Sequence, residues 1–397
     1  MTRTMLARLS LVLGSWGLAS TAYLLGLLLA AAFLEAEPES DGPREAIVPR
    51  LMILVPAHDE ELVVGVTVEA LLRAEYPPER RRVIVIADNC ADATGEVARA
   101  AGAEVWERAQ PDHAGKGQAI AWALRRAAVE SYDAVVMVDA DCIASPNLLL
   151  GLARSVAAGA DATQAHYHAS NPTAAPAAAL RYAGFALMNS VRPLAKSKLG
   201  LSAGLLGSGM AFPARTLTRV PWDAFSVTED REYHLRLIHQ GLTVRYVKDA
   251  SVSSAMPATA SAGTTQQMRW DTGNARLAHR YLGKLLARGL RTKSGNAVHA
   301  ALELLVPPQT LLAATGLGAV AIGLVVQAPA PRRLGCFVLV GQAAYVIGGL
   351  RLVDAPPAVY QALPRAPGLI ARRVVQHALI LSGRGSRAWA RTDRLRA

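Results

Sequence analysis

Short apolar segments alternate with amphipathic ones in the first half of the chain. Four apolar runs of strand length lie at residues 51–55 (LMILV), 83–87 (VIVIA), 103–106 and 134–138 (AVVMV). Three segments with the helical spacing of apolar residues separate them, at residues 60–74, 91–101 and 117–129. Strands that are apolar on both faces and alternate with helices indicate a parallel sheet covered on both sides. The pattern therefore predicts a doubly wound α/β domain, in which ligands bind beyond the carboxyl ends of the strands.

Three longer apolar segments have a different character. They lie at residues 11–34, 304–326 and 334–353. Each has about the 20 residues that a helix needs to cross a bilayer. The first is longer than the apolar core of an ordinary signal peptide, so we favour a transmembrane segment over a cleaved one. The other two are joined by the short segment 327–333 and predict a transmembrane hairpin. Pro307 and Pro308 are expected to kink the first helix of this hairpin or to start it.

These patterns divide the chain into successive parts. They are an N-terminal transmembrane segment (1–34), a linker (35–50), the α/β domain (51–275), a basic interfacial segment (276–300), the transmembrane hairpin (301–353) and a basic tail (354–397). Within the tail, residues 368–381 alternate between basic and apolar types. Such alternation is typical of an amphipathic helix that lies on a membrane surface.

Charge adds an orientation to this picture. The formal net charge is +11, and Arg and Lys gather at residues 276–293 and 365–396, on both flanks of the hairpin. Positive flanks stay in the cytoplasm, so the α/β domain is expected there, in a multi-pass protein of the inner or plasma membrane. Arg3 and Arg8 precede the first apolar segment and acidic residues follow it, which favours the opposite orientation for that segment. Either its N-terminus is periplasmic, or the segment does not cross fully.

Composition excludes some alternatives. Hydrophobic residues make up 52% of the chain and charged residues 18%, as expected for a membrane protein with a large soluble part. The basic clusters flank apolar segments and lack the interleaved aromatic residues on which bases stack, so no nucleic-acid partner is predicted. Cys90, Cys142 and Cys336 have neither the spacing of a metal site nor the number for a disulfide framework. They indicate a reducing compartment for the soluble part.

Acidic residues follow two of the predicted strands. Asp88 comes directly after the second apolar run, and Asp139 and Asp141 follow the fourth. Alone, Asp88 is as compatible with a turn or a helix cap as with a function. Two carboxylates at positions i and i+2 repel one another unless a cation lies between them, and Mg²⁺ or Mn²⁺ suits such oxygen ligands. The alternative is a solvated turn before a helix that starts near Pro146, with Ser145 as its cap.

Two further polar motifs come later in the chain. They are Thr228-Glu229-Asp230 (TED) and Gln266-Gln267-Met268-Arg269-Trp270 (QxxRW). A carboxylate of the first motif suits a general base for an acceptor hydroxyl, but a capped helix start with favourable acids explains the same residues. The arginine of the second suits phosphate charge and its tryptophan suits the face of a sugar ring. An aromatic anchor at the membrane interface is the simpler explanation of that motif.

The order of these motifs is more specific than any one of them. An acid after the second strand, an acid pair after the fourth, TED, QxxRW and then membrane helices resemble the processive members of glycosyltransferase family 2. That group includes cellulose, chitin and hyaluronan synthases and the related ceramide glucosyltransferases. The resemblance covers roughly residues 51–270 and extends loosely into the hairpin. It implies a GT-A type α/β domain that binds a nucleotide-sugar, followed by transmembrane helices.

The resemblance also implies roles for particular residues. The contacts of the nucleotide-sugar would be Pro56, Ala57, Glu60, Asp88, Lys116, Asp139 and Arg269. The contacts of the acceptor would be Gly207, Ser208, Glu229, Gln266 and Trp270. Asp141, together with Asp139, would hold Mg²⁺ or Mn²⁺, and Asp230 would be the catalytic base. His58 stands where asparagine is common, and DNC at Asp88 replaces the usual DDG or DDS, so the nucleobase contacts depart most from the pattern.

For the reaction, the resemblance implies an inverting transfer from a UDP-sugar. Asp230 would accept the proton of an acceptor hydroxyl, while the metal, Lys116 and Arg269 stabilise the departing UDP. The product would be a β-linked sugar on a growing polysaccharide, and the alternative is a single transfer to a membrane lipid. About three spans are few for a polymer channel, so a polysaccharide synthase would need an oligomer or an export partner. A nucleotide-sugar-binding protein without catalysis is a remote alternative, since all the expected acids are present.

Overall fold

A computed structural model describes residues 2–35, 48–127, 131–256 and 260–381, apart from the side chains of residues 260–269 and 378–381. The strands are β1 (Leu51–Ala57), β2 (Arg81–Asp88), β3 (Glu104–Arg108), β4 (Ala134–Met137), β5 (Cys142–Ala144), β6 (Ala162–Ala169), β7 (Met210–Pro213) and β8 (Val244–Ser254). The helices around them are α2 (Val64–Arg73), α3 (Thr94–Ala100), α4 (Lys116–Ala127), α5 (Leu148–Ala157), α6 (Pro176–Ala186), α7 (Arg192–Lys198), α8 (Ala214–Arg219) and α9 (Glu229–His239). The remaining helices are α1 (Arg3–Phe33), α10 (Ala260–Thr292), α11 (Gly295–Leu305), α12 (Gln309–Val325), α13 (Pro329–Leu352), α14 (Pro357–Ala362) and α15 (Ala366–Leu381).

The first half of the sheet agrees with the sequence pattern. The strand order is β3-β2-β1-β4-β7-β6-β8-β5, and β1 is parallel to β2 and β4, as β2 is to β3. The second half is different, because β7 is antiparallel to β4 and β6, and β5 is antiparallel to β8. The parallel arrangement of the four predicted strands is therefore confirmed, but further strands that the pattern did not predict make the sheet mixed. β7 and β5 have only 4 and 3 residues, too few for a periodic pattern.

Alternate residues of a strand enter two separate cores. Leu51, Ile53 and Val55 of β1 pack with α2, α3 and α5 on one face of the sheet. Met52 and Leu54 pack with α4 and α9 on the other face. None of these side chains is more than 2% exposed, which explains why the strands are continuously apolar in sequence. Burial on both faces also specifies the strand register, because a shift by one residue would exchange the faces.

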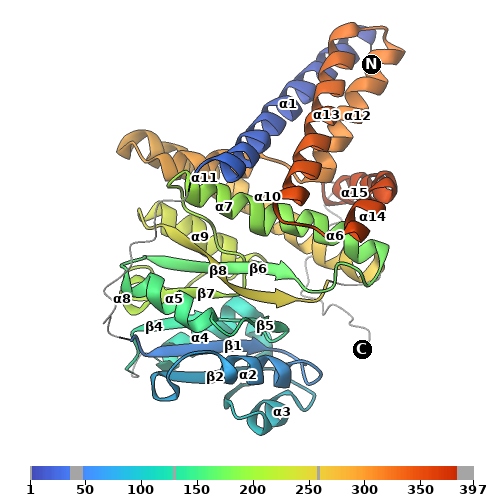
Figure 1. The fold of residues 1–397 in the computed structure, drawn as a ribbon. Helices are drawn as coiled ribbons and strands as arrows, with labels where there is room; N and C mark the ends of the chain where they lie inside the picture. The colour runs from blue at the N-terminus through green and yellow to red at the C-terminus, as the bar shows by residue number, and fades with distance from the viewer. Residues whose placement is uncertain (1, 36–47, 128–130, 257–259, 382–397) are drawn as a thin grey trace.

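Long apolar helices project from one end of this α/β body (Figure 1). Within the described residues, α1 and α13 are long and apolar enough to cross a membrane. The pair α11 and α12 makes a third candidate span if it is taken as one segment, although the two helices are bent by 58°. The bend lies at the predicted prolines, and Pro308 is the N-cap of α12. The prediction that these prolines break or start this segment is confirmed, since proline lacks the N–H that would continue the helix.

Helix α1 runs parallel to α13. Gly14 of α1 packs against Leu334, near the start of α13, and Thr21 packs against Gly341, further along both helices. The start of α1 therefore lies beside the turn between α12 and α13, at the end away from the sheet (Figure 1). This agrees with the first of the two arrangements left open for the N-terminal segment, in which its start and the α/β domain lie at opposite ends.

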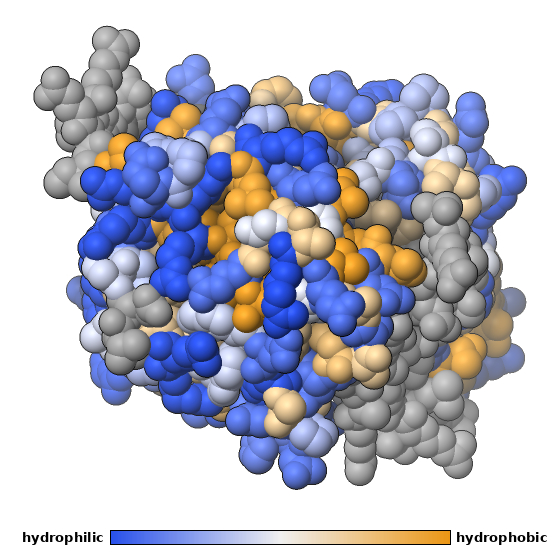
Figure 2. All heavy atoms as spheres, turned by 90° about the horizontal axis from the view of Figure 1, so that it is seen from below, coloured by the Kyte–Doolittle hydropathy of each residue, from blue (hydrophilic) through white to orange (hydrophobic). Residues whose placement is uncertain are grey.

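Exposed apolar side chains concentrate on these helices. They include Leu9, Val12 and Phe33 on α1, Leu317, Leu324 and Val325 on α12, and Phe337, Val340 and Ile347 on α13. Seen from the opposite end of the molecule, the surface is mainly hydrophilic (Figure 2). Large exposed apolar patches mark surfaces that contact a membrane or another protein. The molecule thus has one polar end and one apolar end.

The close packing of α12 and α13 gives a prediction for stability. A Cβ at Gly335 would lie 2.5 Å from the carbonyl oxygen of Gly316, whereas a Cβ at Gly318 would meet nothing within 4 Å. We expect Gly335→Ala to lower the free energy of unfolding by about 1–3 kcal/mol, because the helices must move apart. The matched change Gly318→Ala should leave it unchanged or raise it slightly. Thermal unfolding in detergent measures both, and equal melting temperatures would contradict this packing.

Candidate active site

The acid motifs meet at one edge of the sheet. Asp88 ends β2, Asp139 and Asp141 follow β4, and the TED motif begins α9. Parallel strands present their carboxyl ends on the same side, which brings the first three acids together. A cavity of about 2540 Å³ opens at this edge. The predicted site residues that line it are Pro56, Ala57, Glu60, Asp88, Lys116, Asp139, Asp141, Gly207, Glu229, Asp230 and Trp270.

Lys116 lies at the centre of this cluster. Its Nζ is 2.6 Å from Asp139 Oδ1, 3.3 Å from Glu229 Oε1 and 2.8 Å from the carbonyl oxygen of Gly207. The next residue, Gly117, allows this approach, because a Cβ there would lie 2.3 Å from the carbonyl oxygen of Ala224. One ammonium group therefore connects the acid pair after β4 with the start of α9.

Burial and crowding shift the protonation equilibria of these groups. Burial raises the pKa of Asp139, Glu229 and Asp230, and the attraction of Lys116 offsets this only in part. Burial alone would lower the pKa of the Lys116 ammonium, but the facing carboxylates of Asp139 and Glu229 outweigh it and raise that pKa. The lysine therefore stays charged at neutral pH. A carboxylate with a raised pKa accepts a proton more readily, as a general base must.

Helix capping, the simpler explanation of two motifs, has little support in the structure. Thr228 stands at the N-cap of α9, but its side chain makes no capping hydrogen bond, and its buried Oγ1 has no partner among the described residues. The predicted cap by Ser145 is wrong, because α5 begins after Asn147. The Ser145 hydroxyl instead donates a hydrogen bond of 2.8 Å to Asn147 Oδ1. The other parts of these explanations agree with the structure, because the amide of Cys142 closes a turn by donating 3.0 Å to the carbonyl oxygen of Asp139, and Glu229 and Asp230 lie in the first turn of α9.

The acid pair after β4 fits a divalent cation. Ligand atoms of Asp139, Asp141 and Cys142 lie within 4.8 Å of one another. Burial raises the pKa of the Cys142 thiol well above its usual value, so the neutral sulfur is a poor ligand for a hard cation. The two carboxylates are half-buried and line the cavity. Such oxygen donors suit Mg²⁺ or Mn²⁺, which keep waters and substrate phosphates as further ligands.

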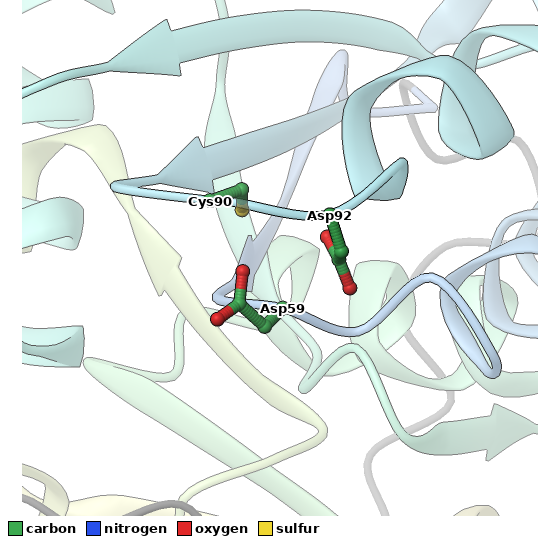
Figure 3. Close-up of side chains that lie close together, drawn as sticks. All are labelled: Asp59, Cys90 and Asp92. Carbon is green, nitrogen blue, oxygen red and sulfur yellow. The ribbon is translucent and has the colours of Figure 1, made fainter.

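A second group of metal-ligand residue types has a structural explanation. Asp59, Cys90 and Asp92 lie close together where the chain leaves β1 and β2 (Figure 3). Asp59 Oδ1 accepts a hydrogen bond of 2.7 Å from the amide of Ala91, and Asp92 Oδ2 accepts one of 3.1 Å from the amide of Glu61. The carboxylates tie the loop after β1 to the loop after β2, so we assign them to loop structure rather than to a metal.

An arginine outside the predicted site binds Asp88. Arg108, at the end of β3, forms a buried ion pair with Asp88 and donates a hydrogen bond of 2.7 Å to the carbonyl oxygen of His113. Asn89 Nδ2 donates to the same carboxylate at 2.9 Å. These charge-assisted contacts hold Asp88 in the cavity wall. The pair depends on the parallel register of β2 and β3, in which Asp88 lies opposite Arg108, and the sequence alone does not reveal that register.

The segment before β7 approaches the acids closely. Gly207 has a φ of 95°, and a Cβ there would lie 3.4 Å from Asp230 Oδ2 and 3.7 Å from Lys116 Nζ. Ser208 is fully buried, and its hydroxyl accepts a hydrogen bond of 3.0 Å from the amide of Asp139. Gly207 thus lines the cavity, and its role as an acceptor contact stays a prediction. The Ser208 hydroxyl instead holds Asp139 from behind, a position different from the acceptor contact that the resemblance implied.

The QxxRW motif is described only in part. It lies on α10, but the side chains of Gln266 and Arg269 are outside the described residues, so their predicted roles stay predictions. Trp270 lines the cavity. Next to it, Asp271 forms a buried ion pair of 2.7 Å with Arg373 of α15. This pair joins the helix of the motif to α15, the helix that the sequence predicted over residues 368–381.

Several further cations line the same cavity, and three of them, on α7 and α9, were not singled out from the sequence. Arg192 and Lys196 lie one turn apart on α7, and Arg231 directly follows the TED motif. The stretch 186–199 contains three basic residues, Arg192, Lys196 and Lys198, and no acid, which was a signal that an anion could lie near it. That Arg192, Lys196 and Arg231 line one cavity with Asp230 is visible only in the tertiary structure.

Comparison with known proteins places this site in a family. Residues 49–273, more than half of the chain, match the family described as Glycosyltransferase like family 2. The chain belongs to glycosyltransferase-like family 2. The predicted family and enzyme class are thereby confirmed, and residues 49–273 form its glycosyltransferase domain. The processive membrane subgroup stays a prediction.

Individual relatives agree with this assignment. The probable glycosyltransferase YdaM of Bacillus subtilis (strain 168) is 27% identical over 253 residues, which cover 60% of this chain and 58% of that protein. The chain thus spans little more than half the length of this relative. The mannosyltransferase PcManGT of Pyrobaculum calidifontis, solved with GDP-Man and Mn²⁺, is 19% identical with a TM-score of 0.56, covering 87% of this chain and 100% of the other. This similarity confirms the GT-A-like fold.

The close approach of the 207 loop gives a prediction for activity. A methyl group at position 207 would contact Asp230 and Lys116, whereas one at Gly200 would meet nothing within 4 Å. Both glycines have positive φ, of 95° and 67°, so alanine at either costs about 1–2 kcal/mol of backbone strain. We expect Gly207→Ala to abolish sugar transfer and Gly200→Ala to retain it at a similar loss of melting temperature. Equal activities would show that the loop does not shape the site.

Proposed function

We propose that this protein is an inverting glycosyltransferase that moves a sugar from a nucleotide diphosphate to a hydroxyl presented at a membrane surface. The proposal is carried by one observation, the convergence of the acid pair after β4 and the TED acids on Lys116. Glycosyl transfer needs a site for the leaving diphosphate and a base for the acceptor hydroxyl, and the two must be separated by no more than the width of one sugar. The two acid groups, joined by one ammonium, meet this requirement.

The donor is assigned to the end of the cavity near β1 and β2. Pro56, Ala57, Glu60 and Asp88 line this end, beyond the carboxyl ends of the parallel strands, where nucleotides bind in such sheets. The charge of Lys116 suits the diphosphate. A UDP-sugar is the donor that the motif pattern favours. PcManGT was solved with GDP-Man, so donor specificity should be measured with both UDP-sugars and GDP-sugars.

The transfer itself follows from the position of Asp230. The acceptor oxygen forms a bond to the anomeric carbon as the bond from that carbon to the diphosphate breaks, and the hydroxyl proton passes to Asp230. Burial raises the pKa of this carboxylate, which suits a general base. Lys116 offsets the negative charge that develops on the leaving diphosphate. A single displacement inverts the anomeric centre, so an α-linked donor gives a β-linked product.

Asp139 and Asp141 are the residues that would hold Mg²⁺ or Mn²⁺ beside the donor. The Asp141 carboxylate raises the pKa of Asp139 by repulsion, and the Lys116 ammonium beside Asp139 is shared with Glu229, so a cation between Asp139 and Asp141 is favoured. When bound, the ion would neutralise the diphosphate and ease its departure. PcManGT was solved with Mn²⁺, which agrees with this choice of metal.

The acceptor is proposed to come from the membrane. Helices α1 and α13, and the bent pair α11 and α12, are assigned to the bilayer because of their apolar, exposed surfaces. The start of α1 and the α/β domain then lie on opposite sides, and the basic flanks of the hairpin favour a cytoplasmic α/β domain. The cavity continues from Asp230 to apolar side chains of α12, α13 and α15. This continuity favours a lipid acceptor over the growing polysaccharide that the motifs first suggested.

The base assignment predicts the behaviour of Asp230→Asn. We expect this variant to lose about two to four orders of magnitude in transfer rate, because an amide cannot accept the hydroxyl proton. Nucleotide binding, measured by calorimetry with UDP and Mn²⁺, should change little. Asp249→Asn, an exposed acid outside the cavity, serves as the matched control and should remain active. Substantial turnover by Asp230→Asn would refute the role of the base.

The metal assignment predicts a loss of activity on chelation. EDTA should stop transfer, and added Mg²⁺ or Mn²⁺ should restore it, because the diphosphate would otherwise leave without charge compensation. Asp141→Asn should weaken UDP binding in the presence of Mn²⁺ but leave metal-free binding unchanged. Full activity in EDTA would remove the metal from the mechanism.

A further inference from the structure

The cavity that contains the acids continues into the helices assigned to the membrane. Its far end is lined by Leu317 of α12, by Leu339 and Val346 of α13, and by Ile370 of α15. The near end is lined by Asp230 and Lys116. A single cavity with a polar end at the proposed base and an apolar end between helices matches the shape of an amphiphile.

Cations line the middle of this cavity. Arg192, Lys196 and Arg231 all reach it, together with the carboxylate of Glu303. Lys196 Nζ is 3.2 Å from both carboxylate oxygens of Glu303, so this acid is engaged by one of the three. Glu303 also faces Arg192 and Arg231, and Asp230 faces Arg231, so three cations share two carboxylates on this stretch of wall. Buried charge without compensation is costly, so an anion is the expected occupant.

Arg192 is held in place by neutral groups. Its Nε is 3.3 Å from the Tyr345 hydroxyl and its Nη2 is 3.5 Å from Gln309 Oε1. Gln309 Nε2 donates to Gln342 Oε1 at 3.0 Å, and Gln342 Nε2 donates to Thr21 Oγ1 at 2.8 Å. This chain of hydrogen bonds across α1, α12 and α13 orients the guanidinium without neutralising it. Since arginine has five N–H donors, others remain for a ligand.

Arg231 is one residue from the proposed base. Within the described part of the chain, its guanidinium makes no hydrogen bond or ion pair at contact distance, although the carboxylates of Glu303 and Asp230 attract it, and it lines the cavity. Burial lowers the pKa of Arg231 and of Lys196, because the loss of contact with water destabilises the charged form of each side chain. An anionic group between Arg231, Arg192 and Lys196 would compensate these charges.

We propose that the acceptor is a lipid whose head group carries both a phosphate and a free hydroxyl. The phosphate binds Arg192, Lys196 and Arg231, the hydroxyl reaches Asp230, and the hydrocarbon tail lies among the side chains of α12, α13 and α15. The hydroxyl oxygen bonds to the anomeric carbon, its proton passes to Asp230, and the nucleotide diphosphate leaves, while the lipid phosphate is unchanged. This inference rests on the proposed function, because Asp230 matters only if the acceptor nucleophile is a hydroxyl.

Lipid binding to the full-length protein in detergent, saturated with UDP and Mn²⁺, tests the proposal by native mass spectrometry. Phosphatidylglycerol supplies phosphate, hydroxyl and tail, diacylglycerol lacks the phosphate, and glycerol 3-phosphate lacks the tail. We expect phosphatidylglycerol to bind at least about tenfold more tightly than diacylglycerol, the effect of one charged hydrogen bond, and at least about tenfold more tightly than glycerol 3-phosphate, which lacks the apolar contacts of the tail. Arg231→Ala should remove most of this preference and Arg231→Lys should retain part of it. Arg351→Ala, an exposed arginine of α13 outside the cavity, is the matched control and should keep it.

Each outcome decides a separate point. Equal binding of phosphatidylglycerol and diacylglycerol, or an equal loss in Arg351→Ala, would overturn the phosphate site. Equal binding of glycerol 3-phosphate would overturn the lipid tail and leave a soluble phosphate ester as the occupant. If the wild type binds UDP with Mn²⁺ but shows no lipid preference, only this inference fails. If lipid preference persists without any nucleotide binding, the proposed function fails instead. Melting temperatures of the variants separate these effects from loss of folding.

Discussion

The contact of the Lys116 ammonium with carboxylates from two regions of the fold is the interaction on which the site depends. Asp139 follows β4 in the parallel half of the sheet, and Glu229 comes from α9, which lies between β7 and β8 in the chain. Without the cation, these buried acids would repel one another, and the chain would have to separate them or protonate them. The contact therefore fixes the separation between the proposed donor end and the proposed base, and it leaves enough negative charge for a divalent ion.

The antiparallel half of the sheet serves this arrangement. β7 lies beside β4, so the loop that precedes it passes next to the acid pair, and Gly207 brings the backbone within reach of Lys116. Ser208 then binds the amide of Asp139 from behind. A parallel strand in this place would begin at the opposite edge of the sheet, so the loop before it would lie away from the acids. Because β7 is antiparallel to β4, the site at the carboxyl ends of the parallel strands also includes the loop that precedes β7.

The same cavity connects the soluble and apolar parts of the molecule. Arg192 lies between them, with its guanidinium oriented by Tyr345 and Gln309 from the helices that project from the body. Without this contact, the projecting helices would only anchor the protein. With it, they form part of the cavity wall, so the proposed acceptor site exists only when α7, α12 and α13 pack together. The break at Pro308 contributes as well, because it separates α11 from α12 and places Gln309 at the cavity.

The sequence by itself determined the parallel strands, the position of Asp88, Asp139 and Asp141 at strand ends, the apolar helices and the family. These features are local, since a fully buried strand must be continuously apolar and a motif is a fixed order of residues. Tertiary structure alone decided the pairing of Asp88 with Arg108, the burial of Ser208 and the cations along the cavity, because each depends on register or on elements far apart in the chain. Short strands such as β7 also carry too few residues for a period, which is why the mixed sheet was not predicted.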